Sequence, residues 1–183
     1  MWCVAELQLP YERLDAGFIY GVVDQPSYLE LNPNGTVPTL QDGDNLPLWK
    51  TGAILRYLAG KYGPGNFWPG EQCARAHVNM WAEWSKLNIA MKFTAPIFWR
   101  VVRTPPSQRE PVAIRKALAE LDRYLDIAES RLSGSRYLIG NHFTLADLQF
   151  GHCLFRYYDI EIARTERRHL RSYYDALTEL MTR

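Results

Sequence analysis

The sequence contains few of the residues that build a disulfide framework or a metal site. It has three cysteines, Cys3, Cys73 and Cys153, which lie far apart and form no Cys-x-x-Cys pair. An odd, scattered set of cysteines is typical of reduced thiols in a cytoplasmic setting, where most serve as small core residues. The four histidines show no spacing typical of metal ligands. We therefore expect a cytoplasmic protein with no metal site.

The sequence also has no large excess of positive or negative charge and no long apolar run. The formal net charge is +1 at pH 7, so the chain has no electrostatic reason to bind nucleic acid or an anionic membrane surface. No apolar run is as long as a membrane span, and residues 1–5 lack the basic start of a signal peptide. We expect partners that are neither nucleic acid nor membrane.

The pattern of residues changes after the first third of the chain. Glycine and proline are concentrated at 63–71, which is typical of a linker, and long helical periodicity begins only after it. The chain has 183 residues, of which 47% are hydrophobic, and this is enough to bury a sizeable core. We predict an α/β domain over 1–62 and an all-helical domain over 72–183.

Short extended segments and turns dominate the first 62 residues. A helix is expected at 1–9, then a strand at 11–14 and a turn of helix around 27–29. Pro38 cannot donate a hydrogen bond inside a strand, so its strand lies at an edge, begins with the proline or contains a bulge. From residue 31 on, the sequence predicts a turn at 32–35, a strand at 37–40, a hairpin turn at 41–45 and a second strand at 46–49. A helix is expected to follow at 52–62, with Thr51 as its N-cap.

Two features of this stretch suit a ligand. A Val37–Pro38 peptide held cis leaves the backbone N–H and C=O of Val37 free to pair with an extended molecule. The N–H groups at the start of the following helix carry partial positive charge and can hold a carboxylate. The alternative is a hairpin packed under a helix with no ligand, and the residues by themselves leave both open.

Apolar residues repeat at helical spacing throughout the second part. A helix over 72–102 carries apolar residues at intervals of three or four, and Pro96 is expected to kink its far end. A second apolar stripe runs over 114–132, and a last helix is expected at 168–181. A helix that lines a core shows the same pattern, so these stripes need no ligand to explain them.

Thr144 and Asp147 stand three residues apart just before an apolar run. Threonine is a good N-cap, and an acid at the third helical position completes a short form of the capping box. Phe143 and Leu148 flank them at the positions of a hydrophobic staple. A catalytic role for the Asp147 carboxylate is the weaker interpretation, so we assign Thr144 and Asp147 to capping.

Several motifs resemble those of one family. Asn-Pro-x-Gly-x-Val-Pro-x-Leu at 32–40, with Leu-Trp-x-Thr-x-Ala-Ile-x-x-Tyr-Leu at 48–58, resembles the glutathione-binding half of cytosolic, bacterial-type glutathione transferases. Phe-Thr-Leu-Ala-Asp at 143–147 resembles the capped, buried helix of the same family. The resemblance implies a thioredoxin-like N-terminal domain followed by an all-helical C-terminal domain.

The resemblance also implies a glutathione site. Its residues are the Val37 backbone, the cis Pro38, and Thr51, whose hydroxyl would hold the γ-glutamyl carboxylate. The family usually has Glu or Gln where this chain has Lys50, and a basic residue where it has Thr36. An ammonium has donors only. Lys50 stays among the expected contacts, and repulsion of the γ-glutamyl ammonium is expected to dominate its effect.

The implied activity is conjugation of the glutathione thiol to a small apolar electrophile, by a homodimer. Trp81, Trp84, Met91 and Trp99 are candidates for the helical wall of the electrophile pocket, although a core role explains them as well. The sequence begins inside what resembles the family's first helix, so we expect the first domain to lack the strand before it and the Tyr, Ser or Cys that contacts the sulfur. We therefore name no catalytic residue. The alternative function is a non-catalytic binding or assembly protein of the same fold.

Overall fold

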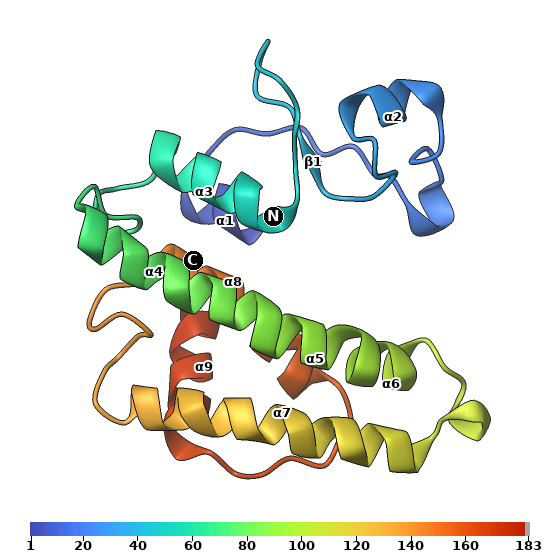
Figure 1. Ribbon diagram of the computed structural model, residues 1–183, viewed down its shortest axis with the longest axis vertical. Coiled ribbons are helices and arrows are strands. Elements are labelled where there is room, and N and C mark those ends of the chain that lie inside the picture. The colour runs from blue at the N-terminus through green and yellow to red at the C-terminus, as the bar shows by residue number, and fades with distance from the viewer. Residues whose placement is uncertain (182–183) are drawn as a thin grey trace. The chain divides into compact units, whose positions relative to one another are not determined.

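The computed structural model, described over residues 1–181, divides the chain into two compact units (Figure 1). The first unit is Met1–Gly63, and the second begins at Pro64. The second unit includes the glycine- and proline-rich stretch, where Phe67 is buried and its ring stacks on Phe143. The predicted fold class is confirmed, with a mixed α/β unit followed by an all-helical one.

The first unit consists of short helices and turns around a very short hairpin. The hairpin pairs two antiparallel strands, with Thr39 opposite Trp49 and Leu40 opposite Leu48. Within this unit, the helix at Trp2–Glu6 packs on the helix at Thr51–Tyr62. The latter buries an apolar face that includes Leu55. The elements are α1 (Trp2–Glu6), the 3₁₀ turn η1 (Phe18–Tyr20), α2 (Pro26–Leu31), β1 (Thr39–Leu40), β2 (Leu48–Trp49) and α3 (Thr51–Tyr62).

The strand predicted at 11–14 is wrong. Tyr11 and Leu14 are 57% and 81% exposed, and within residues 1–181 this segment pairs with no strand. A β-prone segment becomes a strand only when a neighbour takes up its N–H and C=O groups. Both hairpin strands are also shorter than predicted, because the residues beyond Thr39–Leu40 and Leu48–Trp49 have no ladder partner within residues 1–181. The first helix is shorter than predicted as well.

The second unit is a bundle of long helices. In Figure 1, α7 (Pro111–Leu132) lies alongside the long helical path that opens the unit. The helix α8 (Leu145–Asp159) packs against α4 (Gln72–Trp84) and α9 (Arg168–Met181). The predicted helices over 114–132 and 168–181 are confirmed. The opening path runs through α4 (Gln72–Trp84), the π-helical η2 (Ser85–Ala90), α5 (Met91–Phe93), the π-helical η3 (Thr94–Trp99) and α6 (Arg100–Val102), and the 3₁₀ turn η4 (Pro106–Gln108) follows.

Local sequence explains how the long path begins and where it changes. Glu71 precedes α4, and its two carboxylate oxygens accept from the N–H groups of Cys73 and Ala74 at 2.8 and 2.6 Å. This cap satisfies two of the donors that every helix N-terminus leaves open. Pro96 lies inside η3. Proline lacks the N–H of a regular helical bond, and a π-helical segment is one way in which a helix absorbs that loss.

The core of the second unit is centred on α8. Leu145, Phe150 and Leu154 on this helix are each 0% exposed. α7 faces the core with the stripe that its periodicity predicts, through Leu121, Leu125, Ala128 and Leu132. The long path adds Val78, Ile89, Phe93 and Ile97. Burial of this apolar area is the main term that stabilises the helical unit.

Asp147 joins three parts of the helical unit through one carboxylate. It is 0% exposed. Its Oδ2 accepts from the N–H and the hydroxyl of Thr144 at 2.8 and 2.9 Å, and its Oδ1 accepts from the Leu138 N–H at 2.9 Å and the Tyr173 hydroxyl at 2.8 Å. Thr144 and Asp147 form a capping box at the start of α8. The same carboxylate also holds the preceding loop and α9.

Two further contacts fasten the start of α9 to α7. The carboxylate of Glu129 accepts from the N–H groups of His169 and Leu170 at 3.0 and 2.7 Å. The Arg167 side chain, only 3% exposed, forms an ion pair with Asp122 at 2.9 Å. These contacts satisfy open donors at the α9 N-terminus and pair a buried charge.

Candidate functional site

Val37 and Thr51 lie at the same end of the hairpin. Thr39 pairs with Trp49 in the antiparallel ladder, and Val37 and Thr51 each lie two residues beyond that pair. The Val37–Pro38 peptide is cis, as expected from the sequence. Thr51 is the first residue of α3. The hairpin therefore has the segment at Val37 and the N-terminus of α3 at the same end.

Both parts of this site offer backbone groups without partners. Val37 is 44% exposed, and within residues 1–181 its N–H and C=O form no hydrogen bond. In α3, the first helical bond runs from the Ala53 N–H to the Lys50 carbonyl at 3.0 Å, which leaves the N–H groups of Thr51 and Gly52 free within the described chain. An open helix N-terminus suits a carboxylate, and a free strand edge suits an extended backbone.

Lys50 has an unusual backbone conformation just before α3. Its φ of +71° lies where side-chain-bearing residues are rare, and such a conformation costs about 1–3 kcal/mol. The predicted N-cap is wrong, because Lys50 and not Thr51 is the N-cap residue and no side chain caps the helix. The sharp change of direction from β2 into α3 occurs at Lys50, so Thr51 already belongs to the first helical turn.

The Lys50 side chain lies over the turn that leads to Val37. Its Nζ is 3.4 Å from Asn34 Oδ1 and 5.5 Å from the centroid of the Trp49 ring. Within residues 1–181 it forms no ion pair. The ammonium is therefore a positive charge that lies beside Asn34 and Trp49 and has no acidic partner within residues 1–181.

A buried Asn32 shapes the turn before Val37. Its side chain is 1% exposed, and its Nδ2 donates to the Thr36 carbonyl at 2.6 Å while its Oδ1 accepts from the Asn34 N–H at 3.1 Å. The Tyr28 hydroxyl donates to the same Thr36 carbonyl at 2.8 Å. The sequence indicated only a turn at Asn32. The bond from Asn34 back to the Asn32 side chain is an Asx turn, which the Asn-Pro-Asn pattern could have revealed.

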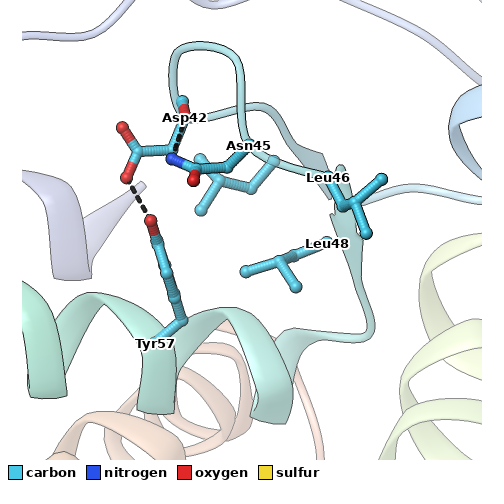
Figure 2. A pocket seen from close by; sticks show the side chains of 6 residues that line it. Asp42, Asn45, Leu46, Leu48 and Tyr57 are labelled. Carbon is cyan, nitrogen blue, oxygen red and sulfur yellow. Dashed lines mark hydrogen bonds between the residues drawn. The ribbon is translucent and has the colours of Figure 1, made fainter.

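The far end of the hairpin is fastened to α3 by a group that we call the Asp42 cluster, formed by Asp42, Tyr57, Lys61 and Tyr62. Asp42 Oδ2 accepts from the Tyr57 hydroxyl at 2.5 Å, the Lys61 ammonium at 2.7 Å and the Tyr62 hydroxyl at 2.7 Å; Figure 2 shows the Tyr57 bond. These bonds, with that of Lys61 first, lower the pKa of Asp42 to about 2. The sequence indicated only turn residues at Asp42, because its partners come from a helix 15–20 residues away.

The structure brings together two of the four candidates for an electrophile wall. The rings of Trp81 and Trp84 pack edge to face with centroids 5.0 Å apart, and Trp84 packs in the same way on the buried Phe150. Trp81 also lines a cavity of about 440 Å³ in the helical unit. Met91 and Trp99 are 62% and 41% exposed. The first pair is thus half-buried against Phe150, and the second pair is open to solvent in the described chain.

Two of the cysteines are buried thiols that resist ionisation. Burial raises the pKa of Cys3 to about 11 and that of Cys153 to about 12. Thiolates are the nucleophilic form, so these two side chains are inert. Among residues 1–181, no three His, Cys, Asp or Glu side chains are placed to share a metal ion, and no helix combines the length and apolarity needed to cross a membrane.

Models of both domains of one family match this chain. The glutathione S-transferase N-terminal domain matches residues 1–60, and the C-terminal domain matches residues 90–181. Glutathione S-transferase GstB of Escherichia coli K12 is 32% identical over 175 residues, which are 95% of this chain and 84% of that relative. The chain belongs to the glutathione S-transferase family.

Other relatives agree with this assignment. The probable glutathione S-transferase GSTF2 of rice, Oryza sativa subsp. japonica, is 32% identical over 80% of this chain and 70% of its own length. The theta class glutathione S-transferase of the citrus canker pathogen Xanthomonas axonopodis pv. citri, solved with glutathione bound, has a TM-score of 0.90 and 38% identity over 96% of this chain and 84% of that chain. The family inferred from the motifs at 32–58 and 143–147 is confirmed.

Proposed function

We infer that this protein is a glutathione transferase, which joins the thiol sulfur of glutathione to a small apolar electrophile. The observation that carries this inference is the free Val37 backbone beside the open N-terminus of α3, in a chain that matches both domains of the family. The relative with glutathione bound supports the same ligand.

Glutathione would lie across the base of the hairpin. Its cysteinyl unit is extended and pairs with the backbone of Val37, next to the cis Pro38. Its γ-glutamyl carboxylate accepts from the Thr51 hydroxyl and from the free N–H groups of Thr51 and Gly52. The Lys50 ammonium stands near the γ-glutamyl ammonium, and like charges repel, so Lys50 weakens the binding of glutathione.

The reaction is a nucleophilic substitution by sulfur. The thiol of glutathione loses its proton, the sulfur–carbon bond forms, and the leaving group departs with the electron pair of the bond that breaks. We assign no residue of the described chain to stabilising the thiolate. Trp81, Trp84, Met91 and Trp99 remain the proposed wall for the electrophile. We also propose a cytoplasmic homodimer with the domains at 1–62 and 72–183, as the family resemblance implies.

Calorimetry with glutathione and a conjugation assay with an aryl halide test this proposal. The wild type is expected to bind glutathione and to form the thioether. Thr51→Ala removes a hydrogen bond to a charged group and should weaken binding by about 1.5–3 kcal/mol. Ser107→Ala removes an exposed hydroxyl from the second unit and should change nothing. A wild type that bound no glutathione would overturn the proposal, and binding without turnover would favour the non-catalytic alternative.

A further inference from the structure

We propose that Asp42 is a positioning residue for the glutathione site: its contacts with α3 fasten the far end of the hairpin and so fix the geometry of the end that carries Val37 and Thr51. This inference rests on the proposed function, because the quantity that Asp42 controls is the affinity for glutathione. Asp42 itself lies outside the site, at the opposite end of the ladder from Val37.

The hairpin is too short to hold its own geometry. β1 and β2 have two residues each, and an isolated two-stranded hairpin is at best marginal in water even when its strands are longer. Leu46 at the tip is 87% exposed. A cavity of about 330 Å³ lies between the hairpin and α3, where Leu40 and Leu48 are only half-buried, so apolar packing there is incomplete. Leu40, Asp42, Asn45, Leu46, Leu48 and Tyr57 line this cavity (Figure 2).

The Asp42 cluster supplies the missing attachment. Three donors from α3 converge on one carboxylate oxygen at 2.5–2.7 Å. Tyr57 and Lys61 are four residues apart and therefore lie on one face of the helix. Lys61 Nζ also donates to the Tyr57 hydroxyl at 3.0 Å and lies 5.0 Å from the centroid of the Tyr62 ring. Contacts among Tyr57, Lys61 and Tyr62 therefore help to fix these side chains, in addition to their bonds with Asp42.

The two attachments of the hairpin to α3 form a closed frame. The base of the hairpin continues directly into α3 at Thr51, and the tip is fastened at Tyr57, Lys61 and Tyr62. These residues lie about 9–16 Å further along the helix at 1.5 Å per residue. Because the hairpin is attached to α3 at its base and at its tip, a rotation of the hairpin relative to α3 would strain or break one of these attachments. Without Asp42, the described polar contacts that remain in the hairpin are its own ladder and turn bonds and those of Tyr28 and Asn32 with Thr36 and Thr39, and the carboxylate no longer ties its tip to α3.

Because the Asp42 cluster lies at the surface, its loss should affect the geometry of the hairpin more than the stability of the fold. The side chains of Asp42 and Lys61 are 26% and 42% exposed. Water can therefore replace the lost partners when Asp42 is removed, and exposed ion pairs contribute little to folding. Removal of Asp42 is expected to change the geometry of the hairpin and to leave the fold of α3 and of the helical unit intact.

Asp42→Ala tests the functional part of the inference. The variant is expected to raise both the Kd and the KM for glutathione about five- to tenfold, the equivalent of one or two hydrogen bonds. The kcat and the KM for the electrophile should stay within about twofold, a split that a general loss of folding would not produce. Asp44→Ala is the matched control: it removes an equal charge from the same turn, and within residues 1–181 Asp44 is exposed and forms no ion pair.

Hydrogen exchange without glutathione tests the mechanical part. Asp42→Ala should speed exchange of the amides at 39–51 and leave those of α7 unchanged. Tyr57→Phe keeps the ring but removes one donor, and should act in the same direction more weakly. The double variant should bind glutathione no more weakly than Asp42→Ala alone, because both changes remove the same contact.

The outcomes separate this inference from the proposed function. Wild-type affinity in Asp42→Ala, or wild-type exchange at 39–51, would overturn the positioning role. A double variant whose losses simply multiply would show that Tyr57 acts independently of Asp42, which also contradicts it. If the wild type bound no glutathione, the proposed function would fail, and exchange would still decide whether Asp42 holds the hairpin.

Discussion

Asp147 in the helical unit and Asp42 in the N-terminal unit each accept hydrogen bonds from several elements, but their surroundings are opposite. Asp147 is 0% exposed, whereas the Asp42 side chain is 26% exposed. Burial raises the pKa of Asp147 against the effect of its hydrogen bonds. At Asp42 the donors from α3 dominate and lower the pKa to about 2. The same kind of contact therefore belongs to a core in one unit and to a surface in the other.

The two units also differ in how much apolar surface they bury. In the helical unit each long helix contributes buried apolar side chains. In the N-terminal unit the buried apolar side chains come from α1 and α3, while Leu14 and Ile19 between them are 81% and 89% exposed. The helical unit is held by its core, whereas the tip of the hairpin that carries the candidate site is fastened to α3 by polar contacts. Regions with little buried apolar area open most easily, and binding sites are commonly found there.

Asp147→Ala should have the largest effect of the three changes that probe this comparison. It leaves the donors of Leu138, Thr144 and Tyr173 buried without an acceptor, and each such loss costs about 1–3 kcal/mol. Partial relaxation around the site leads us to expect about 3 kcal/mol of lost unfolding free energy. Glutathione affinity per folded molecule should stay the same. Denaturant unfolding and calorimetry measure the two quantities.

A control on the same unit checks that burial is the cause. Asp175→Ala removes a carboxylate that pairs with Arg171 at 3.0 Å on the exposed side of α9, with about half of each side chain open to solvent. Its effect on stability should be within about 0.5 kcal/mol. If Asp147→Ala kept its stability and lost activity, Asp147 would be a site residue and its assignment as a cap would be wrong.

The difference between the units also explains what the sequence could predict. The stripe of α7 and the Thr144–Asp147 cap are patterns within a few residues of each other, so local rules find them. The strand expected at 11–14 failed because strand formation depends on a partner that the segment itself does not contain. The family motif predicts Val37 and Thr51 as glutathione contacts, which stays a prediction, while the N-cap is Lys50, one residue before the predicted position.

Two side chains that shape the site were not recognised from the sequence. Asn32 and Asp42 both lie in turn-rich segments, where their types already have a local explanation. Their importance comes from burial in one case and from convergence with Tyr57 and Lys61 in the other. The spacing of Tyr57 and Lys61 shows that they share a helix face. It does not show that a hairpin will bring a carboxylate to that face.

Lys50→Glu should have an effect of intermediate size. Asp147→Ala is expected to change stability and not glutathione affinity, whereas Lys50→Glu should change glutathione affinity and not stability. Replacing the ammonium by a carboxylate turns repulsion of the γ-glutamyl ammonium into attraction. At an exposed site this should tighten glutathione binding about three- to tenfold, and less at high salt. Lys86→Glu on the helical unit makes the same change of charge far from the hairpin in sequence and should leave the affinity alone. Calorimetry that found weaker binding for Lys50→Glu would mean that Lys50 contacts a carboxylate of glutathione.

Acid should produce the smallest effect on the hairpin, through the Asp42 carboxylate. The pKa of Asp42 is about 2 in the folded protein against an ordinary value of 3.8. A lowered folded pKa means that the folded state favours the ionised carboxylate, so the contribution of Asp42 is complete above its ordinary pKa and is lost as the pH falls toward 2. Hydrogen exchange at 39–51 should therefore differ between the wild type and Asp42→Asn at pH 5, and the difference should shrink steadily below about pH 4. The cluster is exposed and screened by salt, which keeps the effect small. A difference that persisted unchanged at pH 2 would show that the hairpin is held by neutral hydrogen bonds from Tyr57 and Tyr62, and that the charge of Asp42 is not what fastens it.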